Sequence, residues 1–402
     1  MQTRKSIQAS QLPELYDQIN RQLDRLGIES QPAVAARLTE LIQDPEAGPV
    51  DFAQAIRNDA AISGRLLKLS NSAAFGQARE VTSIDRACML MGQERLRSMA
   101  LGFYLSRSAT DPDHEELSRR VWGESVLRGC LAAELARETH GVGVPEAFLV
   151  GLLLDSGVSV MNRMLKSRYE TFTAPEIEPE ELFRLEFESL PMTHVDVAAA
   201  LCRRWRLPDV LSKPIAWHHT PPPARPPETD VQRMQRIAYC AGLVSLREGV
   251  GADVFVHEAR SRLGLQKDQL DALCTRALAE YKLTIDLFDS VAQRSPGASA
   301  LMDMVHQRLV DAHDDLICAD GPSPAPAALP RFTLGSSVIE IERTDSGVAV
   351  AYLIDDNGDR IIAHHFMPSQ ENAATIAQAL AIRRVDGDES PGLEAHLRAI
   401  AA

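Results

Sequence analysis

The sequence is poor in aromatic residues and has no closely spaced cysteines. Phe, Trp and Tyr make up 5% of the 402 residues, and the plentiful Ala and Leu favour helix packing instead. The six cysteines lie far apart, and no two of them form a C-x-x-C pair. This spacing excludes a disulfide framework and is typical of a protein from a reducing compartment.

Long apolar runs and a basic charge balance are also absent. No stretch of eighteen consecutive apolar residues occurs, and residues 1–18 hold no apolar run of a signal peptide. We therefore expect no membrane span and a cytoplasmic protein. The formal net charge of −14 would repel a nucleic acid at long range. Neither a nucleic acid nor a membrane is expected as a partner.

The motifs of several common enzyme classes are missing. There is no G-x-x-x-x-G-K-[ST] phosphate loop, no G-x-G-x-x-G after a strand and no G-x-S-x-G elbow. The acidic run at residues 176–188 is typical of a solvated helix face, so no general acid/base pair stands out. The basic segment Arg203–Arg206 allows a phosphate site, but a helix end with Trp205 packed inward explains it better.

What the sequence does contain is helical periodicity. Apolar residues recur at spacings of three and four from about Leu12 to Asp289, with Pro and Gly between the segments. This predicts an all-α region over residues 1–290, with a first part at 12–220 and a helical continuation at 229–290. The Pro-rich break at residues 220–227 is interpreted as a stiff connector between helices.

The pattern changes after a second Pro-rich stretch. Residues 291–330 are predicted to form a helix and a Pro-rich linker, and residues 331–402 a small separate domain. A helix through Ile376, Leu380 and Ile382 should cover the apolar face of its sheet. The expected fold is thus mainly all-α with a small C-terminal α+β (β-β-β-α) unit. Its strands should be the alternating runs Ser337–Arg343, Val348–Ile354 and Ile361–Phe366.

Residues 58–97 are the most informative segment of the chain. An apolar helical face through Ile62 and Leu66 is followed by the small-residue turn 71–76 and then by a second helical face through Ile84 and Met91. This order resembles the signature half of the HDOD family, the regulatory relatives of HD-type metal phosphohydrolases. The resemblance covers roughly Leu12 to Thr220.

The HDOD resemblance implies a non-catalytic function. It implies an HD-like helical domain in a bacterial signal-transduction protein that acts through contacts with other signalling proteins, and it is compatible with a homo-oligomer. No receiver, GGDEF or EAL module accompanies it. The interaction surface is expected to include Asn71, Phe75, Arg95 and Arg97.

The resemblance also points to positions that hold metal in the HD superfamily. There, an early His, a His-Asp pair, further His residues and a late Asp bind a divalent ion that activates water. In this chain Glu124 stands at the early His, Leu154 replaces the His of the pair, and Gly242 stands at the late Asp. Because Leu and Gly supply no ligand atom, we predict neither enzyme activity nor a cofactor.

Four ligand-type residues survive as candidates for a vestigial site. A single His on a helix is more often satisfied by hydrogen bonds than ligated, and an adjacent His pair can point to opposite faces, so we expect no metal. Two alternatives stay open: a degenerate metal-dependent phosphohydrolase, and a nucleotide or cyclic-dinucleotide sensor that uses the cavity of the lost site. The four candidates are Asp155, His194, His218 and His219.

Overall fold

The structure is a computed structural model of the 402-residue chain. It describes residues 3–288 apart from 8–10, 29–36, 39, 42–43, 45, 58, 72–79, 111–114, 174–176, 178, 223–225, 228 and 245–251. Beyond residue 288 it describes residues 292, 305, 330–334, 337–343, 349–354, 360–366, 376 and 391–401. The predicted 291–330 linker therefore lies almost wholly outside the described residues.

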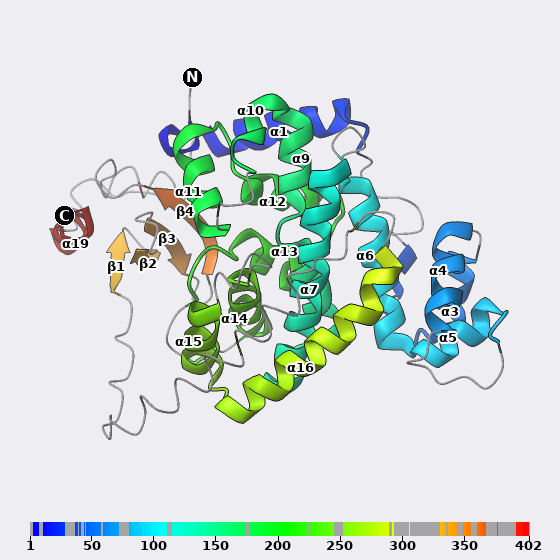
Figure 1. The fold of residues 1–402 in the computed structure, drawn as a ribbon. Helices are drawn as coiled ribbons and strands as arrows, with labels where there is room; N and C mark the ends of the chain where they lie inside the picture. Colours follow the sequence, from blue (N-terminus) through cyan, green and yellow to red (C-terminus); the bar gives the residue numbers. More distant parts are fainter. Residues whose placement is uncertain are drawn as a thin grey trace.

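The described part of the region before residue 289 is helical, which confirms the predicted all-α fold class. Figure 1 shows the strands at one side of this helical body and α3–α5 at the other. The helices are η1 (Arg4–Ser6), α1 (Leu12–Arg25), α3 (Pro49–Ile56), α4 (Ala60–Ser70), α5 (Ile84–Met91), α6 (Gln93–Ala109), α7 (Glu115–Thr139), α8 (Val144–Leu153), α9 (Ser156–Leu165), α10 (Ser167–Glu170), α11 (Pro179–Ser189), α12 (His194–Arg204), α13 (Asp209–Ala216), α14 (Asp230–Gly242), α15 (Ala252–Leu263), α16 (Lys267–Thr284) and η4 (Ile285–Phe288).

The core is built around α7 and α8. Helix α7 packs along α8, α14 and α16, and α8 also contacts α6 and α13. The stretch Val144–Leu165, which is α8 and α9, is long and apolar enough by composition to cross a membrane. Its window is 78% buried within the fold, as expected for the central helices of a globular core. The five described cysteines are also buried and free.

The basic segment at the end of α12 is a packed helix end. Trp205 is fully buried, as the sequence predicted. The guanidinium of Arg203 lies 4.1 Å from the centre of the Tyr16 ring, and Arg204 donates to the carbonyl oxygen of Ile28 at 2.8 Å. These cations therefore join α12 to α1 and the turn that follows it.

The C-terminal unit has one strand more than expected. Its four strands form an antiparallel meander in the order β1-β2-β3-β4, and β1 is the addition. The apolar side of the sheet, with Ile339 and Ile341, packs against Leu393 and Leu397 of α19 (Pro391–Ala401). Of the helix predicted through Ile376, Leu380 and Ile382, only Ile376 is described. The strands are β1 (Arg331–Leu334), β2 (Ser337–Arg343), β3 (Ala349–Ile354) and β4 (Arg360–Phe366).

The sheet contacts the helical body beside α13. The ring of Tyr352 on β3 meets the ring of Trp217, the residue that follows α13, edge to face at 6.3 Å between centroids. Leu12 at the start of α1 also packs against the core of the sheet. Aromatic and aliphatic contacts therefore join the C-terminal unit to the end of α13 and the start of α1.

Two glycines set the separation of the central helices. A Cβ on Gly151 of α8 would overlap the main chain of Arg128 on α7, and a Cβ on Gly157 of α9 would overlap the carbonyl oxygen of His194 on α12. The absence of side chains lets α8 approach α7 and α9 approach α12 at backbone contact distance. Asp155 lies between the two glycines and is thereby held between α7 and α12.

Replacing Gly157 tests this close approach. We expect Gly157→Ala to lower the free energy of unfolding by about 1–3 kcal/mol, because α9 and α12 must separate to admit the methyl group. The measurement is urea unfolding followed by circular dichroism. Gly64→Ala on α4 is the control: its Cβ would have no described atom within 4 Å, so it should leave stability unchanged or raise it by up to about 1 kcal/mol. Equal effects of the two variants would contradict this account.

Candidate metal centre

The structure brings the four surviving candidates together. Asp155 lies at the junction of α8 and α9, His194 is the first residue of α12, and His218 and His219 follow α13. One ligand atom from each lies within 4.8 Å of the other three. The three imidazoles are buried, and the side chain of Asp155 is 15% exposed. We call these four residues the His₃Asp cluster.

The ligand atoms face a common centre. Nε2 of His194 lies 3.1 Å from Nε2 of His219. Oδ1 of Asp155 lies 3.7 Å from Nε2 of His194 and 3.5 Å from Nε2 of His218. The adjacent pair His218 and His219 therefore does not point to opposite faces, the arrangement on which the expectation of no metal partly depended.

The opposite nitrogen of each imidazole has an oxygen partner. Nδ1 of His194 lies 2.7 Å from Oε2 of Glu186, Nδ1 of His219 lies 2.8 Å from Oε1 of Glu180, and Nδ1 of His218 lies 2.8 Å from the carbonyl oxygen of residue 215. A carboxylate or carbonyl oxygen accepts, so the proton of each neutral ring is assigned to Nδ1. Each Nε2 then presents a lone pair, which is how metal-binding histidines are commonly oriented.

Helix α11 supplies two of these acceptors, a role the sequence reasoning missed. Glu180 and Glu186 belong to the acidic run that was interpreted as a solvated face, but Glu186 is fully buried. It accepts from the main-chain N–H of His194 at 2.7 Å and from the hydroxyl of Tyr169. The spacing of six residues does not place 180 and 186 on one face of an ideal helix, so periodicity gave no signal for this pair.

Local hydrogen bonds fix where α12 begins, and thus where His194 lies. Thr193 and Asp196 form a capping box, with the N–H of Thr193 donating to Asp196 at 2.9 Å. Arg4 also donates to Asp196 at 2.9 Å in a buried ion pair. The N-terminal segment therefore stabilises the helix start that presents His194.

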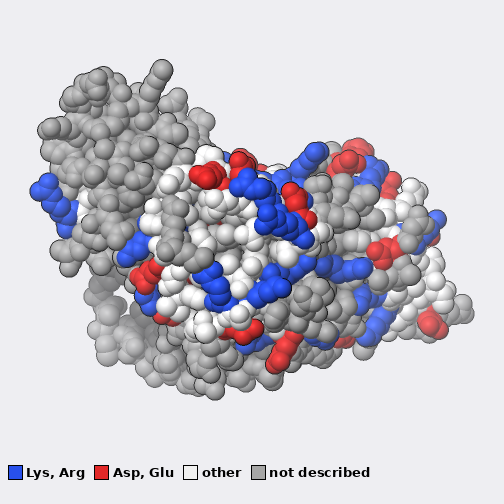
Figure 2. Space-filling model, turned by 90° about the horizontal axis from the view of Figure 1, so that it is seen from above, with Lys and Arg blue, Asp and Glu red and all other residues white. Residues whose placement is uncertain are grey.

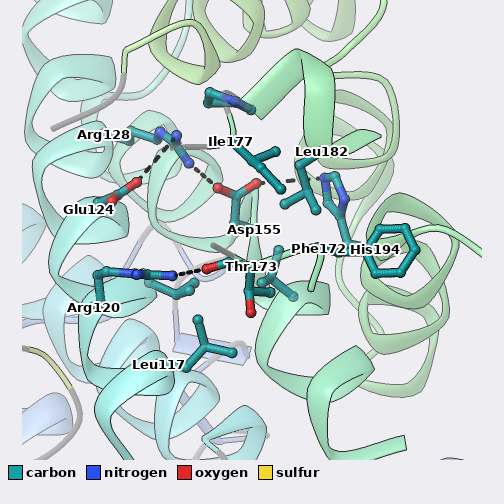
Figure 3. A pocket seen from close by; sticks show the side chains of 13 residues that line it. Leu117, Arg120, Glu124, Arg128, Asp155, Phe172, Thr173, Ile177, Leu182 and His194 are labelled. Carbon is teal, nitrogen blue, oxygen red and sulfur yellow. Dashed lines mark hydrogen bonds and ion pairs between the residues drawn. The ribbon is translucent and has the colours of Figure 1, made fainter. Parts of the chain in front are cut away.

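An arginine lies on the other side of Asp155 (Figure 3). The Arg128 guanidinium bonds Oδ2 of Asp155, lies 3.8 Å from Glu124, and donates through Nε to the carbonyl oxygen of Val244 at 2.8 Å. Burial favours the neutral acid, but Arg128 and the neighbouring histidines hold the pKa of Asp155 well below its usual range. Asp155 is therefore an anion whose Oδ2 bonds Arg128 and whose Oδ1 faces the Nε2 atoms of His194 and His218.

Burial lowers the pKa of all three histidines, and nearby carboxylates reverse the effect at His194. It lowers the pKa of His218 to about 4, with the proximity of His219 adding to the effect, and it holds the pKa of His219 well below the usual value. At His194, burial is outweighed by Glu186 and Asp155, so its pKa is raised. His218 and His219 are thus neutral rings at neutral pH.

The substituted positions border the same cluster. A Cβ on Gly242 would lie 3.4 Å from Cδ2 of His218 and 3.6 Å from Cδ1 of Leu154. Glu124 is within reach of Arg128, as described above. Glu124 and Gly242 therefore each lie beside a residue that contacts Asp155, and Leu154 lies beside Gly242.

The cavity beside Asp155 is small. It has a volume of about 30 Å³, and Arg120, Asp155, Phe172 and His194 are among the residues that line it (Figure 3). Ligand pockets for nucleotide-sized molecules are about 300–1,000 Å³. This cavity has room for one or two water molecules.

The predicted interaction residues have varied surroundings. The amide of Asn71 donates to the carbonyl oxygens of Leu67 and Val81 at 2.9 Å and accepts from the N–H of Val81 at 2.7 Å, so it holds together the two ends of segment 71–81. Arg95 forms an ion pair with Glu280 of α16. Phe75 and the side chain of Arg97 lie outside the described residues.

Comparison with known proteins finds a family match over much of the helical region. Residues 28–221 match the model of the HDOD domain. An uncharacterized protein of Treponema pallidum (strain Nichols) is 26% identical over 230 residues, which are 55% of this chain and 44% of that protein. A Marinobacter aquaeolei VT8 protein described as a signal transduction protein has a TM-score of 0.51 at 20% identity, covering 64% of this chain and 59% of that one. A Geobacter sulfurreducens HDOD domain protein with unknown function has a TM-score of 0.45 at 20% identity, covering 71% and 92%.

These likenesses cover only part of the proteins compared. The chain spans less than two thirds of the length of the Treponema and Marinobacter proteins. At 20% identity, the Marinobacter structure shows a common fold alone.

Removing Glu186 tests the support of His194. We expect Glu186→Ala to lower the free energy of unfolding by about 3 kcal/mol, since three buried donors lose their acceptor. The measurement is urea unfolding monitored by fluorescence. Glu181→Ala on the same helix is the control: Glu181 is 42% exposed and paired with Arg184, so its loss should cost less than about 1 kcal/mol. A similar cost for both variants would contradict the buried role of Glu186.

Proposed function

Because the chain carries an HDOD domain over residues 28–221, we propose that it is a non-catalytic bacterial signal-transduction protein that acts through contacts with other proteins. The proposal places it in the cytoplasm and gives it neither a nucleic acid nor a membrane as partner. The net charge of −14 supports the absence of a nucleic-acid partner. So does the face in Figure 2, where basic and acidic side chains lie side by side. Among the described residues of this face, acidic side chains interrupt the basic ones, whereas a phosphate backbone favours a continuous positive patch.

One observation carries the non-catalytic part of the proposal. Hydrolysis by an HD-type centre needs an ion that keeps an open position for the attacking water. Here Oδ2 of Asp155 is already bonded to Arg128, and the neighbouring positions 154 and 242 supply no ligand atom. A buried guanidinium cannot lose its proton or activate water, so the cation bonded to Oδ2 of Asp155 is one that cannot generate a nucleophile.

The absence of turnover can be measured directly. We expect the full chain, supplied in turn with Mn²⁺, Fe²⁺, Mg²⁺ and Zn²⁺, to hydrolyse neither bis(p-nitrophenyl) phosphate nor cyclic dinucleotides above the protein-free rate. Asp155→Ala is the matched control. Turnover that this substitution abolishes would overturn the proposal in favour of a degenerate metal-dependent phosphohydrolase.

A second cavity, a groove lined in part by α7 and α8, supports a protein partner. Its volume is about 370 Å³, and it lies among α5, α6, α7, α8 and α16. Met91, Met99 and Phe148 give it apolar walls, while Arg95 and Glu280 supply charge. Met and Arg are enriched where proteins meet, because both adapt to a partner surface. The groove also contains the end of the 58–97 signature segment.

A charge placed in this groove tests the partner surface. We expect Val144→Glu, at the first residue of α8, to reduce capture of partner proteins from a bacterial lysate at least tenfold, as quantified by mass spectrometry. A carboxylate is tolerated at a helix N-terminus but would be desolvated under a bound partner. Val254→Glu on α15, at a residue 44% exposed, should leave capture unchanged. Equal capture by both variants and the wild type would place the partner surface elsewhere.

A further inference from the structure

We propose that the His₃Asp cluster binds one zinc-class divalent cation, and that the guanidinium of Arg128 takes the place of a second cation beside Asp155. This inference goes beyond the proposed function, because a bound ion is compatible with the absence of turnover. The ion would have a structural role, because its ligands come from separate segments of the helical body.

The lone pairs of the imidazoles converge on one point. With each Nδ1 donating to an oxygen, the Nε2 atoms of His194 and His219 face each other as two acceptors only 3.1 Å apart. Two lone pairs at this distance repel unless a proton or a metal cation lies between them. Nε2 of His218 is buried and has no hydrogen-bond partner among the described residues. Oδ1 of Asp155 brings a negative charge to the same centre.

The spacing of the ligand atoms suits a small tetrahedral ion. Zinc binds imidazole nitrogen and carboxylate oxygen at about 2.0–2.1 Å, so ligand atoms at neighbouring corners of the tetrahedron lie about 3.3 Å apart. Three of the separations in the cluster are 3.1, 3.5 and 3.7 Å, and all four ligand atoms lie within 4.8 Å of one another. Three imidazoles favour Zn²⁺ and its neighbours in the first transition row over Mg²⁺ or Ca²⁺, which prefer oxygen.

The oxygen partners of the rings form a supporting shell. Glu186 and Glu180 each orient one imidazole, and the carbonyl oxygen of residue 215 orients the third. Such partners commonly strengthen metal binding by 10–100-fold, because they fix the tautomer and the direction of the lone pair. Phe183 stacks on the ring of His219 at 4.8 Å between centroids, which further restricts that ring.

Arg128 explains why the site is for one ion and not two. A carboxylate can bridge two cations, one at each oxygen, and Oδ2 of Asp155 instead bonds the guanidinium. The same guanidinium approaches Glu124 and the carbonyl oxygen of Val244. Position 124 matches a ligand position of the HD superfamily, and position 244 lies two residues after another. A fixed organic cation therefore lies among the segments that would surround the second metal.

A single ion here would join three segments of the fold. Its ligands come from the α8–α9 junction, the first residue of α12 and the turn after α13, which are far apart in sequence. Binding to the folded state alone raises stability by mass action. The ion would therefore act as a cross-link in the helical body without any chemical step.

Metal content and stability are the readouts. The full chain is stripped with a chelator, dialysed against Zn²⁺ and assayed by elemental analysis, with a parallel thermal melt. We expect about one zinc per chain and a rise in Tm on loading. Replacing Zn²⁺ with Co²⁺ should produce the visible d–d bands of a tetrahedral site. Less than about 0.1 zinc per chain, or no Co²⁺ spectrum, would overturn the proposal.

Variants assign the ligands and the role of Arg128. His219→Gln should lose the zinc, Glu186→Gln should bind it 10–100-fold more weakly, and His257→Gln, at an exposed residue on α15, should bind it like the wild type. The quadruple variant E124H/R128M/L154H/G242D, checked for folding by circular dichroism, should bind two ions per chain. One ion in this folded variant would refute the role of Arg128, and zinc retained by H219Q would refute the site. Neither assay depends on turnover or partner capture.

Discussion

The bond between Arg128 and Asp155 is the interaction on which the centre of this molecule depends. A buried arginine needs an anion, and a buried aspartate needs a cation or several donors. Each satisfies the other, and both lie at the place where α7, α8, α9 and α12 meet. Removing either would leave an uncompensated charge in the interior, a far larger penalty than the loss of a surface ion pair.

The geometry around this pair depends on two glycines, which have no side chain, as much as on the side chains that form the contacts. The glycines that flank Asp155 in the sequence let the helices approach until the carboxylate reaches both the guanidinium and the imidazoles. With alanine at either position the helices would lie further apart, and one of the two contacts of Asp155 would lengthen. A glycine in the middle of a helix costs conformational entropy, and here the cost is offset by the contacts that form around the aspartate.

Much of the fold could be predicted from the sequence, because helical periodicity and the alternation of strands reflect burial directly. The three predicted strands begin and end within a residue of β2, β3 and β4, whereas β1 has only four residues and was missed. The centre was harder to predict. Leu154 and Gly242 could be recognised as positions without ligand atoms, but that Glu180 and Glu186 support the imidazoles depends on how α11 lies against α12. Arg128 gave no signal either, since an arginine in a helix is ordinarily assigned to the surface.

The contact between Trp217 and Tyr352 gives the short segment after α13 two neighbours at once. Trp217 meets the C-terminal sheet, and the next two residues present their imidazoles to the interior. Three consecutive residues in one turn cannot move independently, because each peptide unit is planar and only two dihedral angles per residue can adjust. The turn after α13 is therefore the segment in which the C-terminal sheet and the buried cluster come within one residue of each other along the chain, so the packing of the sheet constrains the backbone that presents two of the imidazoles.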